Sequence, residues 1–414
     1  MAVRHNTLWA LAIKMALVAL ALSACAAPTA VPPTATPTEL PTATPLPPTT
    51  TPQSTPTSET NAGVPATSIQ IASPWGLAFD PDGNLYVTQC FGINLWQPYM
   101  YKIDSFGLLR VFALDGGMNS LGFSGDGGPA RAALMDCPGG VAADRDGNLY
   151  VADVGNNRIR RIDRNGIINT VADSGPAGVA GDVQGMAMAG SFGGDGGPAT
   201  SARLWGPVAV AFDPAGDLYI ADSNNNRVRK VDRQGIITTV VGTGVDGFSG
   251  DGSQATAAQV SQTGDGWLWI ATDAEGNLYL ADNNRIRKVD QQGIITTIAG
   301  TGEEGFSGDG GLATAAKFSG ICGMAFDAQG NLYLSDIGNQ RVRKIETHGV
   351  ITTVAGTGVQ DFSGDGGLAT AATLNGPGAL AFDREGNLYI NDYGNNRVRK
   401  VDKNGIITTA AGHF

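Results

Sequence analysis

The sequence contains almost no histidine, and it lacks the common signatures of catalysis. Its 414 residues include 3 His: His5 near the N-terminus, His348 in an expected hairpin turn and His413 near the C-terminus. They do not supply the His cluster of a zinc site. A Gly-x-Ser-x-Gly elbow and a Cys–His pair, which mark nucleophilic enzymes, are also missing from the sequence. We therefore predict no catalytic residue, no cofactor and no metal.

Basic residues are outnumbered by acidic ones. Lys and Arg number 27 against 38 Asp and Glu, which gives a net charge of −11. This excess argues against nucleic acid as a partner. Charged residues make up only 16% of the chain, whereas Gly is abundant, with 59 residues. That composition is typical of a β-rich protein dense in turns, and it argues against a helical or a disordered chain.

A long repeat organises the rest of the sequence. The block Gly-(Asn or Asp)-Leu-Tyr occurs six times, at intervals of 54 to 69 residues, starting at Gly83, Gly147, Gly216, Gly276, Gly330 and Gly386. Each copy holds four short apolar runs separated by turn residues. In the third copy these runs are 208–212, 218–221, 227–231 and 236–241. Four such runs joined by tight turns predict one antiparallel sheet.

Both faces of that sheet are partly apolar, because Val208 and Val210 alternate with Ala209 and Ala211. Such a sheet must be covered on both sides. Six like sheets in a ring meet this need, so we predict an all-β, six-bladed β-propeller of four-stranded antiparallel blades. An open β-solenoid is the alternative, but its coils are usually much shorter. The last copy contains all four runs, so the ring is expected to close by packing of the first blade on the sixth.

Three recurring blocks resemble the NHL-repeat family over about residues 74–414. They read Gly-Asn-Leu-Tyr, Ala-Asp-x-x-Asn-Asn-Arg-Val-Arg-Lys-Val-Asp and Gly-Ile-Ile-Thr-Thr-Val-Ala-Gly. The family motif often reads Asn-His-Arg, and Asn157, Asn226 and Asn396 occupy the His position in this chain. Loops reading Phe-Ser-Gly-Asp-Gly-Gly resemble those of large bacterial NHL proteins and of teneurin NHL domains. The resemblance implies a six-bladed propeller that serves most often as a binding platform, although some relatives are enzymes.

The N-terminal residues predict export and anchoring. Residues 1–25 combine Arg4 and Lys14 with an apolar run and end in Leu-Ser-Ala-Cys, which resembles the lipobox whose Cys25 is lipidated. An ordinary cleaved signal or a transmembrane anchor is the alternative, although the run is short for a span. Residues 26–64 are rich in Pro and Thr and predict a disordered, extended stalk. The propeller is expected over residues 65–414, as a monomer held outside the cytoplasm by its lipid.

The two faces of the predicted ring differ in their variability. The turn face carries uniform tight turns such as 80–83, 144–147 and 383–386. The loop face carries the second-to-third-strand loops and the blade connections, including the variant loop 89–99 and the long connection 172–190. Variable loops on a rigid scaffold commonly bind ligands. Candidate binding residues there are Phe91, Trp96, Tyr99, Trp267 and Trp269; the alternative is that such aromatics cap the blade cores, as expected for Trp75 and Trp205.

An acidic and a basic residue bracket the second-to-third-strand loop in five blades. We predict scaffold ion pairs across this loop, with an anion-binding Arg ring as the alternative. The pairs are Asp153 with Arg158, Asp222 with Arg227, Asp282 with Arg285, Asp336 with Arg341, and Asp392 with Arg397. A further Asp recurs in the Gly-Asp-Gly connections, at Asp126, Asp195, Asp251, Asp309 and Asp365. One carboxylate per loop favours turn formation over calcium binding.

Cys90 and Cys137 are both expected on the loop face, between adjacent blades. A disulfide between them is geometrically reasonable in an oxidising compartment, with Cys322 as the odd cysteine; buried thiols are the alternative.

The sequence as a whole favours a surface-anchored, non-catalytic module that binds an extracellular protein or glycan. A lactonase-like or other hydrolase with its site at the channel mouth is the alternative, and a purely structural envelope component is a third possibility.

Overall fold

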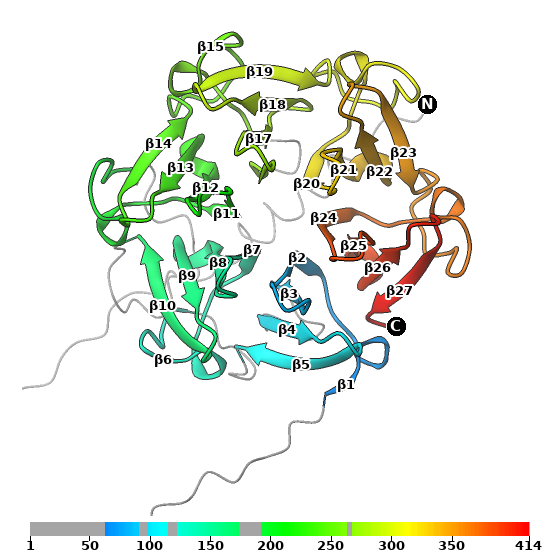
Figure 1. The fold of residues 1–414 in the computed structure, drawn as a ribbon, viewed down its shortest axis with the longest axis horizontal. Helices are drawn as coiled ribbons and strands as arrows, with labels where there is room; N and C mark the ends of the chain where they lie inside the picture. Colours follow the sequence, from blue (N-terminus) through cyan, green and yellow to red (C-terminus); the bar gives the residue numbers. More distant parts are fainter. Residues whose placement is uncertain (1–62, 91–97, 115–121, 174–191, 263–266, 414) are drawn as a thin grey trace, which may run out of the picture. The chain divides into compact units, whose positions relative to one another are not determined.

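The computed structural model describes residues 63–90, 98–114, 122–173, 192–262 and 267–413. They belong to one compact unit, Gly63–Phe414. Six antiparallel sheets stand around a central axis (Figure 1). The predicted all-β, six-bladed propeller is thus confirmed. The expected signal segment 1–25, its Cys25 and nearly all of the stalk 26–64 lie outside the described residues.

Each blade is built from consecutive strands, which follow one another from the axis outward. Blade one contains β2 (Pro74–Phe79), β3 (Leu85–Gln89), β4 (Tyr99–Ile103) and β5 (Leu108–Ala113). Blade two contains β7 (Pro138–Ala143), β8 (Leu149–Asp153), β9 (Arg158–Ile162) and β10 (Ile167–Ala172). Blade three contains β11 (Pro207–Phe212), β12 (Leu218–Asp222), β13 (Arg227–Val231) and β14 (Ile237–Val241).

The other three blades repeat this order. Blade four contains β16 (Ile270–Thr272), β17 (Leu278–Ala281), β18 (Ile286–Val289) and β19 (Ile294–Ala299). Blade five contains β20 (Ile321–Phe326), β21 (Leu332–Asp336), β22 (Arg341–Ile345) and β23 (Ile351–Ala355). Blade six contains β24 (Pro377–Phe382), β25 (Leu388–Asp392), β26 (Arg397–Val401) and β27 (Ile407–Ala411).

Turn chemistry places the strand ends close to where the sequence predicts them. In blade three the loop after β12 is a short 3-10 turn, η5 (Ser223–Asn225), closed by Asn226 in the left-handed conformation (φ 48°). Asn accepts this conformation more readily than other residues with a side chain. Gly235, also left-handed (φ 78°), closes the hairpin before β14. Blade four has a shorter loop, in which only Asn283 and Asn284, both left-handed, separate Asp282 from Arg285.

Three blades have a fifth, two-residue strand that the sequence did not predict. The strands β1 (Val64–Pro65), β6 (Gly128–Pro129) and β15 (Ser253–Gln254) pair with the outermost strands β5, β10 and β19. Each belongs to the connection that enters its blade. The connection therefore covers part of the exposed outer edge, where unpaired backbone groups would otherwise invite aggregation.

The ring closes without a shared strand, as expected. The Gly412 amide donates to the Ala66 carbonyl (3.0 Å), and the Gly242 amide makes the same bond to Ala255 (3.0 Å) between blades three and four. The residues Ala66–Ser68 form η1, in the place of the 3-10 turn Ala255–Ala257 (η6). The junction between blades six and one is thus built like the others, from hydrogen bonds and packing.

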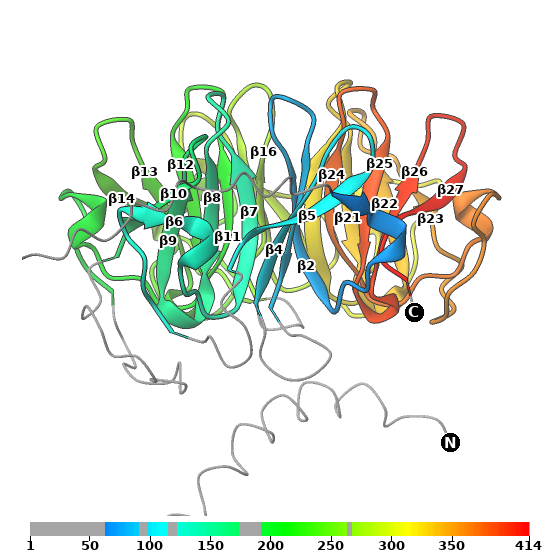
Figure 2. The same ribbon diagram turned by 90° about the horizontal axis from the view of Figure 1, so that it is seen from below.

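Aromatic pairs join neighbouring blades near the turn face, which is the upper edge in Figure 2. Tyr150 of β8 meets Phe212 of β11 edge-to-face (4.8 Å between ring centroids), and Tyr333 of β21 meets Phe382 of β24 in the same way (4.9 Å). Such pairs add to the area that adjacent sheets bury against each other. Within the described residues, no helix is long and apolar enough to cross a bilayer.

Candidate functional site

Two tryptophans from opposite sides of the ring meet at its axis. Trp75 lies in β2 of blade one, and Trp267 lies three residues before β16, the inner strand of blade four, which stands across the ring in Figure 1. Their ring centroids are 6.0 Å apart in an edge-to-face arrangement. Both side chains are partly buried and pack on one apolar cluster together with Val154 and Ile337. The two indoles therefore meet near the place where the inner strands begin, on the loop face.

Glycines let neighbouring inner strands approach each other closely at two other junctions of the ring. An added Cβ at Gly140 of blade two would lie 2.9 Å from the Ala209 Cα, and one at Gly323 of blade five would lie 2.8 Å from the Ala379 Cα. Neighbouring inner strands approach so closely that only glycine fits at these positions.

The structure places the predicted aromatic binding residues in different environments. Trp267 is partly exposed and contacts Trp75, which packs on the buried core as expected from the sequence. Trp269 is 5% exposed and belongs to the buried core, so little of its side chain is available to a ligand. Tyr99 begins β4 and packs beside Tyr101 in its own blade (5.7 Å). Phe91 and Trp96 lie outside the described residues.

The recurring acidic residue pairs with a different arginine from the one predicted. In blade three the Asp222 carboxylate is 3.5 Å from Arg229, although Arg227 stands directly opposite Asp222 in the β12–β13 register. Arg229 is fully buried and also donates to Asp195 of the preceding connection and to the carbonyls of Arg203 and Gly193. One buried guanidinium thus ties the second strand to the connection.

Five blades share this arrangement, which corrects the predicted pairing. The inner pairs are Asp153–Arg160 (3.4 Å), Asp222–Arg229 (3.5 Å), Asp282–Arg287 (2.9 Å), Asp336–Arg343 (3.2 Å) and Asp392–Arg399 (3.3 Å). The same arginines bind Asp126, Asp195, Asp251, Asp309 and Asp365 of the connections. These connection carboxylates therefore serve the scaffold, and within the described residues no group of three or more His, Cys, Asp or Glu side chains is placed to hold a metal.

The arginine predicted to pair instead stacks on a phenylalanine. The Arg227 guanidinium lies 3.9 Å from the ring centre of Phe192 and donates to the Thr243 carbonyl (2.6 Å). The corresponding pairs are Arg158–Phe123, Arg285–Phe248, Arg341–Phe306 and Arg397–Phe362, at 3.9 to 4.0 Å. The Phe of the motif Phe-Ser-Gly-Asp-Gly-Gly thus stacks on one arginine of the blade. The Asp of the motif pairs with the arginine two residues further along the strand. A nearly constant spacing between the connection Asp and the second Arg was the sequence signal that would have revealed the pairing.

Burial opposes ionisation of the inner carboxylates. Burial raises the pKa of Asp153 to about 7 and that of Asp222 to about 6, although the neighbouring arginines and hydrogen-bond donors act in the opposite direction. For Asp282, Asp336 and Asp392, burial likewise raises the pKa. Desolvation disfavours the charged form of a carboxyl group. Because burial raises the pKa of the equivalent Asp in all five of these blades, we attribute the shift to the repeated scaffold and not to a binding site.

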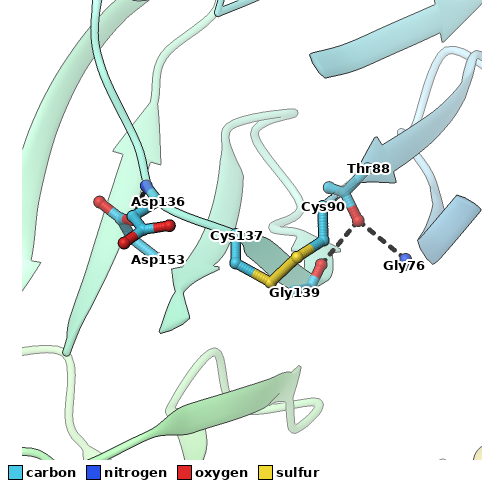
Figure 3. The surroundings of a disulfide bond; sticks show 7 residues. All are labelled: Gly76, Thr88, Cys90, Asp136, Cys137, Gly139 and Asp153. Atoms are coloured by element: carbon cyan, nitrogen blue, oxygen red, sulfur yellow. Dashed lines mark hydrogen bonds between the residues drawn. A yellow bond between two sulfur atoms is a disulfide. The ribbon is translucent and has the colours of Figure 1, made fainter. Parts of the chain in front are cut away.

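A disulfide joins Cys90 and Cys137 across the first junction of the ring, with the Cα atoms 4.2 Å apart (Figure 3). Cys90 follows β3 of blade one, and Cys137 precedes β7 of blade two. Beside it the Thr88 hydroxyl donates to the Gly139 carbonyl (2.7 Å) and accepts the Gly76 amide (2.8 Å). The two cysteines thus lie between adjacent blades, as the sequence indicated.

A hollow of about 260 Å³ opens between blades one and two on the turn face. It lies where Tyr86 has no phenylalanine to meet in blade two, because Ala143 stands at the position of Phe212; Tyr86 packs instead on Phe112 of its own blade. Asp82 and Arg164 bridge its rim (3.0 Å). The missing ring explains the hollow without a ligand.

The residue ranges 119–180, 177–247, 246–307 and 357–414 match the family described as the teneurin NHL domain, and together these ranges cover more than half of the chain. The chain belongs to this family. Teneurin-1 of Mus musculus is 33% identical over 245 residues, covering 53% of this chain and 8% of the relative. Teneurin-m of Drosophila melanogaster is 27% identical over 364 residues, covering 81% of this chain and 12% of the relative. This teneurin NHL-type chain therefore spans about a tenth of the length of these relatives.

Solved structures share the fold at low sequence identity. A protein of unknown function from Bacteroides thetaiotaomicron has a TM-score of 0.56 at 18% identity, covering 82% of this chain and 72% of that one. An auxiliary nutrient binding protein from Bacteroides ovatus has a TM-score of 0.54 at 16% identity, covering 82% and 70%. These neighbours show the propeller fold alone for the teneurin NHL-type chain.

Proposed function

We propose that this protein is a surface-anchored, non-catalytic binding module that holds an extracellular protein or glycan at the axis of its loop face. The observation that carries the proposal is the meeting of Trp75 and Trp267. Blades two to six repeat the same charged scaffold, whereas the two tryptophans come from blades one and four, on opposite sides of the ring. A binding site normally breaks the symmetry of a repeat, because its ligand is not symmetric.

The chemistry of this surface suits recognition through rings and apolar groups. Trp75, Trp267, Val154 and Ile337 are each partly exposed and pack on a common buried cluster. Tryptophan is a frequent anchor in protein interfaces, and its face stacks on apolar surfaces at little entropic cost. The rigid packing beneath holds both indoles before a ligand arrives, which lowers the cost of binding.

The test compares Trp267→Ala with Phe106→Ala in the full chain, on a glycan array and against proteins of the cell envelope. Phe106 is 87% exposed at a turn between β4 and β5, on the opposite face, so it controls for loss of an exposed aromatic ring. We expect Trp267→Ala to weaken binding by about tenfold or more, as for an interface anchor. Phe106→Ala should bind normally. Equal binding by both variants, with melting temperatures showing that both are folded, would refute the proposal.

Anchoring is a separate part of the proposal and has its own test. The Leu-Ser-Ala-Cys block supports lipidation at Cys25, and the Pro- and Thr-rich residues that follow suit an extended spacer. Cells supplied with an alkyne fatty acid should label the wild-type protein and a Cys322→Ser variant, but not Cys25→Ser. Labelling of Cys25→Ser at the wild-type level contradicts the anchor.

A further inference from the structure

Four of the blade junctions share one hydrogen bond, which we call the amide clasp. The residue just before an inner strand donates its backbone N–H to an Asn or Gln side chain of the preceding blade. The donors and acceptors are Gly206 and Asn157 (2.7 Å), Gly320 and Asn284 (2.8 Å), Gly376 and Gln340 (2.6 Å), and Ser73 and Asn396 (2.9 Å). Every one of these eight residues has a positive φ. The clasp therefore joins two left-handed corners of adjacent blades.

Among the described residues, the junction between blades one and two lacks the side-chain amide that makes this clasp. By the strand order, Cys137 stands at the position of Gly206, and it has the same left-handed conformation (φ 51°). The position of Asn157, immediately before the third strand, is taken by Pro98. Proline has no side-chain amide, so it cannot accept the N–H of Cys137.

The disulfide links the same corner of blade two to blade one. Its other half, Cys90, follows the second strand of blade one, at the position that Val154, Ser223 and Ile337 occupy in their blades. Cys90 is 1% exposed, whereas Cys137 is partly exposed. Of the two half-cystines, Cys137 is therefore the one nearer to solvent.

Both ends of the disulfide are fixed to their own blades. On the side of blade two, the Asp136 amide donates to the Asp153 carboxylate (2.8 Å), and the Gly155 amide donates to the Asp136 carbonyl (2.9 Å). On the side of blade one, Cys90 directly follows Gln89, whose side chain accepts the Ala72 amide (2.9 Å). The bond therefore connects two rigid corners across the junction.

We propose that the Cys90–Cys137 disulfide replaces the amide clasp at this junction and makes it the redox-sensitive joint of the ring. The inference does not depend on the proposed binding role. In the reductive step a dithiol gives two protons and two electrons to the S–S bond; Cys90 and Cys137 become thiols, and the dithiol becomes a cyclic disulfide. The first junction then retains the Thr88–Gly139 hydrogen bond and its packing, but it has neither clasp nor covalent link.

Hydrogen exchange on the full chain, oxidised and treated with a dithiol, tests this proposal. Reduction should accelerate exchange about tenfold or more in peptides covering 85–90 and 136–143, and leave the equivalent peptides at the junction of blades two and three unchanged. Asn157→Ala is the matched control, because it removes an amide clasp. It should accelerate exchange around Gly206 and leave the first junction unaltered.

A double variant checks the same point without a reductant. Cys90→Ser with Cys137→Ser places at each position a residue that the chain itself uses there, at Ser223 and Ser73, the latter with φ 44°. It should reproduce the exchange pattern of the reduced protein. The proposal would be overturned by unchanged exchange at the first junction once alkylation has confirmed two additional thiols, or by an equal rise at every junction.

Discussion

Blade one and blade three hold the incoming connection through a side chain at the same position of the second strand, but that side chain is neutral in blade one and acidic in blade three. In blade three the Asp222 carboxylate accepts the Trp205 amide (2.7 Å) and faces the buried Arg229. In blade one Gln89 accepts the Ala72 amide (2.9 Å), and the Tyr101 hydroxyl donates to the same Gln oxygen (3.3 Å). The acceptor for the incoming connection is kept, while both charges are lost.

The outer half of this network is neutral in blade one as well. Tyr99 stands at the position of Arg227, and in the sequence Ala62 stands at that of Asp195. Two acidic and two basic residues are thus replaced together by neutral ones. A buried charge without a partner is costly, so removing Asp222, Arg229 or Asp195 alone would leave its partners unbalanced. The comparison indicates that the charged network is gained or lost as a unit.

The largest expected effect comes from breaking the network of blade three at its centre. Arg229→Met removes the guanidinium that binds both Asp222 and Asp195. The buried Asp222 carboxylate then has no ion pair. We expect a loss of about 3–5 kcal/mol in the free energy of unfolding, measured by denaturant titration. A loss below about 1 kcal/mol would mean that the pair contributes little beyond its packing.

A smaller loss is expected when the chemistry of blade one is transferred to blade three. Asp222→Gln combined with Arg229→Tyr recreates the neutral pair of Gln89 and Tyr101. The double variant should be less destabilised than the sum of the two single variants by about 1–3 kcal/mol, because each single change leaves an unmatched partner. Strictly additive losses in this double-mutant cycle would contradict the idea of a unit.

A still smaller effect is expected at the first arginine of the motif. Arg227→Ala removes the stacking on Phe192 and the bond to the Thr243 carbonyl, but no buried ion pair. We expect about 1–2 kcal/mol of destabilisation and unaltered ligand binding. If Arg227→Ala were as harmful as Arg229→Met in the same titration, the pairing with Asp222 that the sequence predicts would regain support.

The smallest effect concerns pH. Asp153 and Asp222 have raised pKa values in the folded protein, about 7 and about 6, whereas an unfolded Asp titrates at 3.8. The folded state therefore holds protons that the unfolded state has released, so their contribution to stability is complete below about pH 4 and is lost as the pH rises through 6 to 7. Melting temperatures between pH 4 and 8 should fall less steeply for Asp153→Asn than for wild type. Parallel profiles would show that Asp153 titrates normally.

Most of the fold could be predicted because its signals are local and recur six times. The alternation of Val208 and Val210 with alanines, the left-handed Asn226 and the turn glycine Gly235 each specify their own segment. The pairing of the charged residues was harder to predict. Asp222 faces two arginines on the same side of β13, and strand spacing alone does not say which guanidinium turns inward. The partner was decided by Asp195, which reaches Arg229 from the connection 34 residues earlier in the chain.

The sequence by itself determined the repeat, the strands, the turns and the neighbourhood of Cys90 and Cys137, because each depends on residues in one copy or in two adjacent ones. Only the tertiary structure decided that Trp75 and Trp267 meet and that Trp269 is buried. The contact of Trp75 with Trp267 joins blades on opposite sides of the ring, and its geometry follows from how six sheets close around an axis.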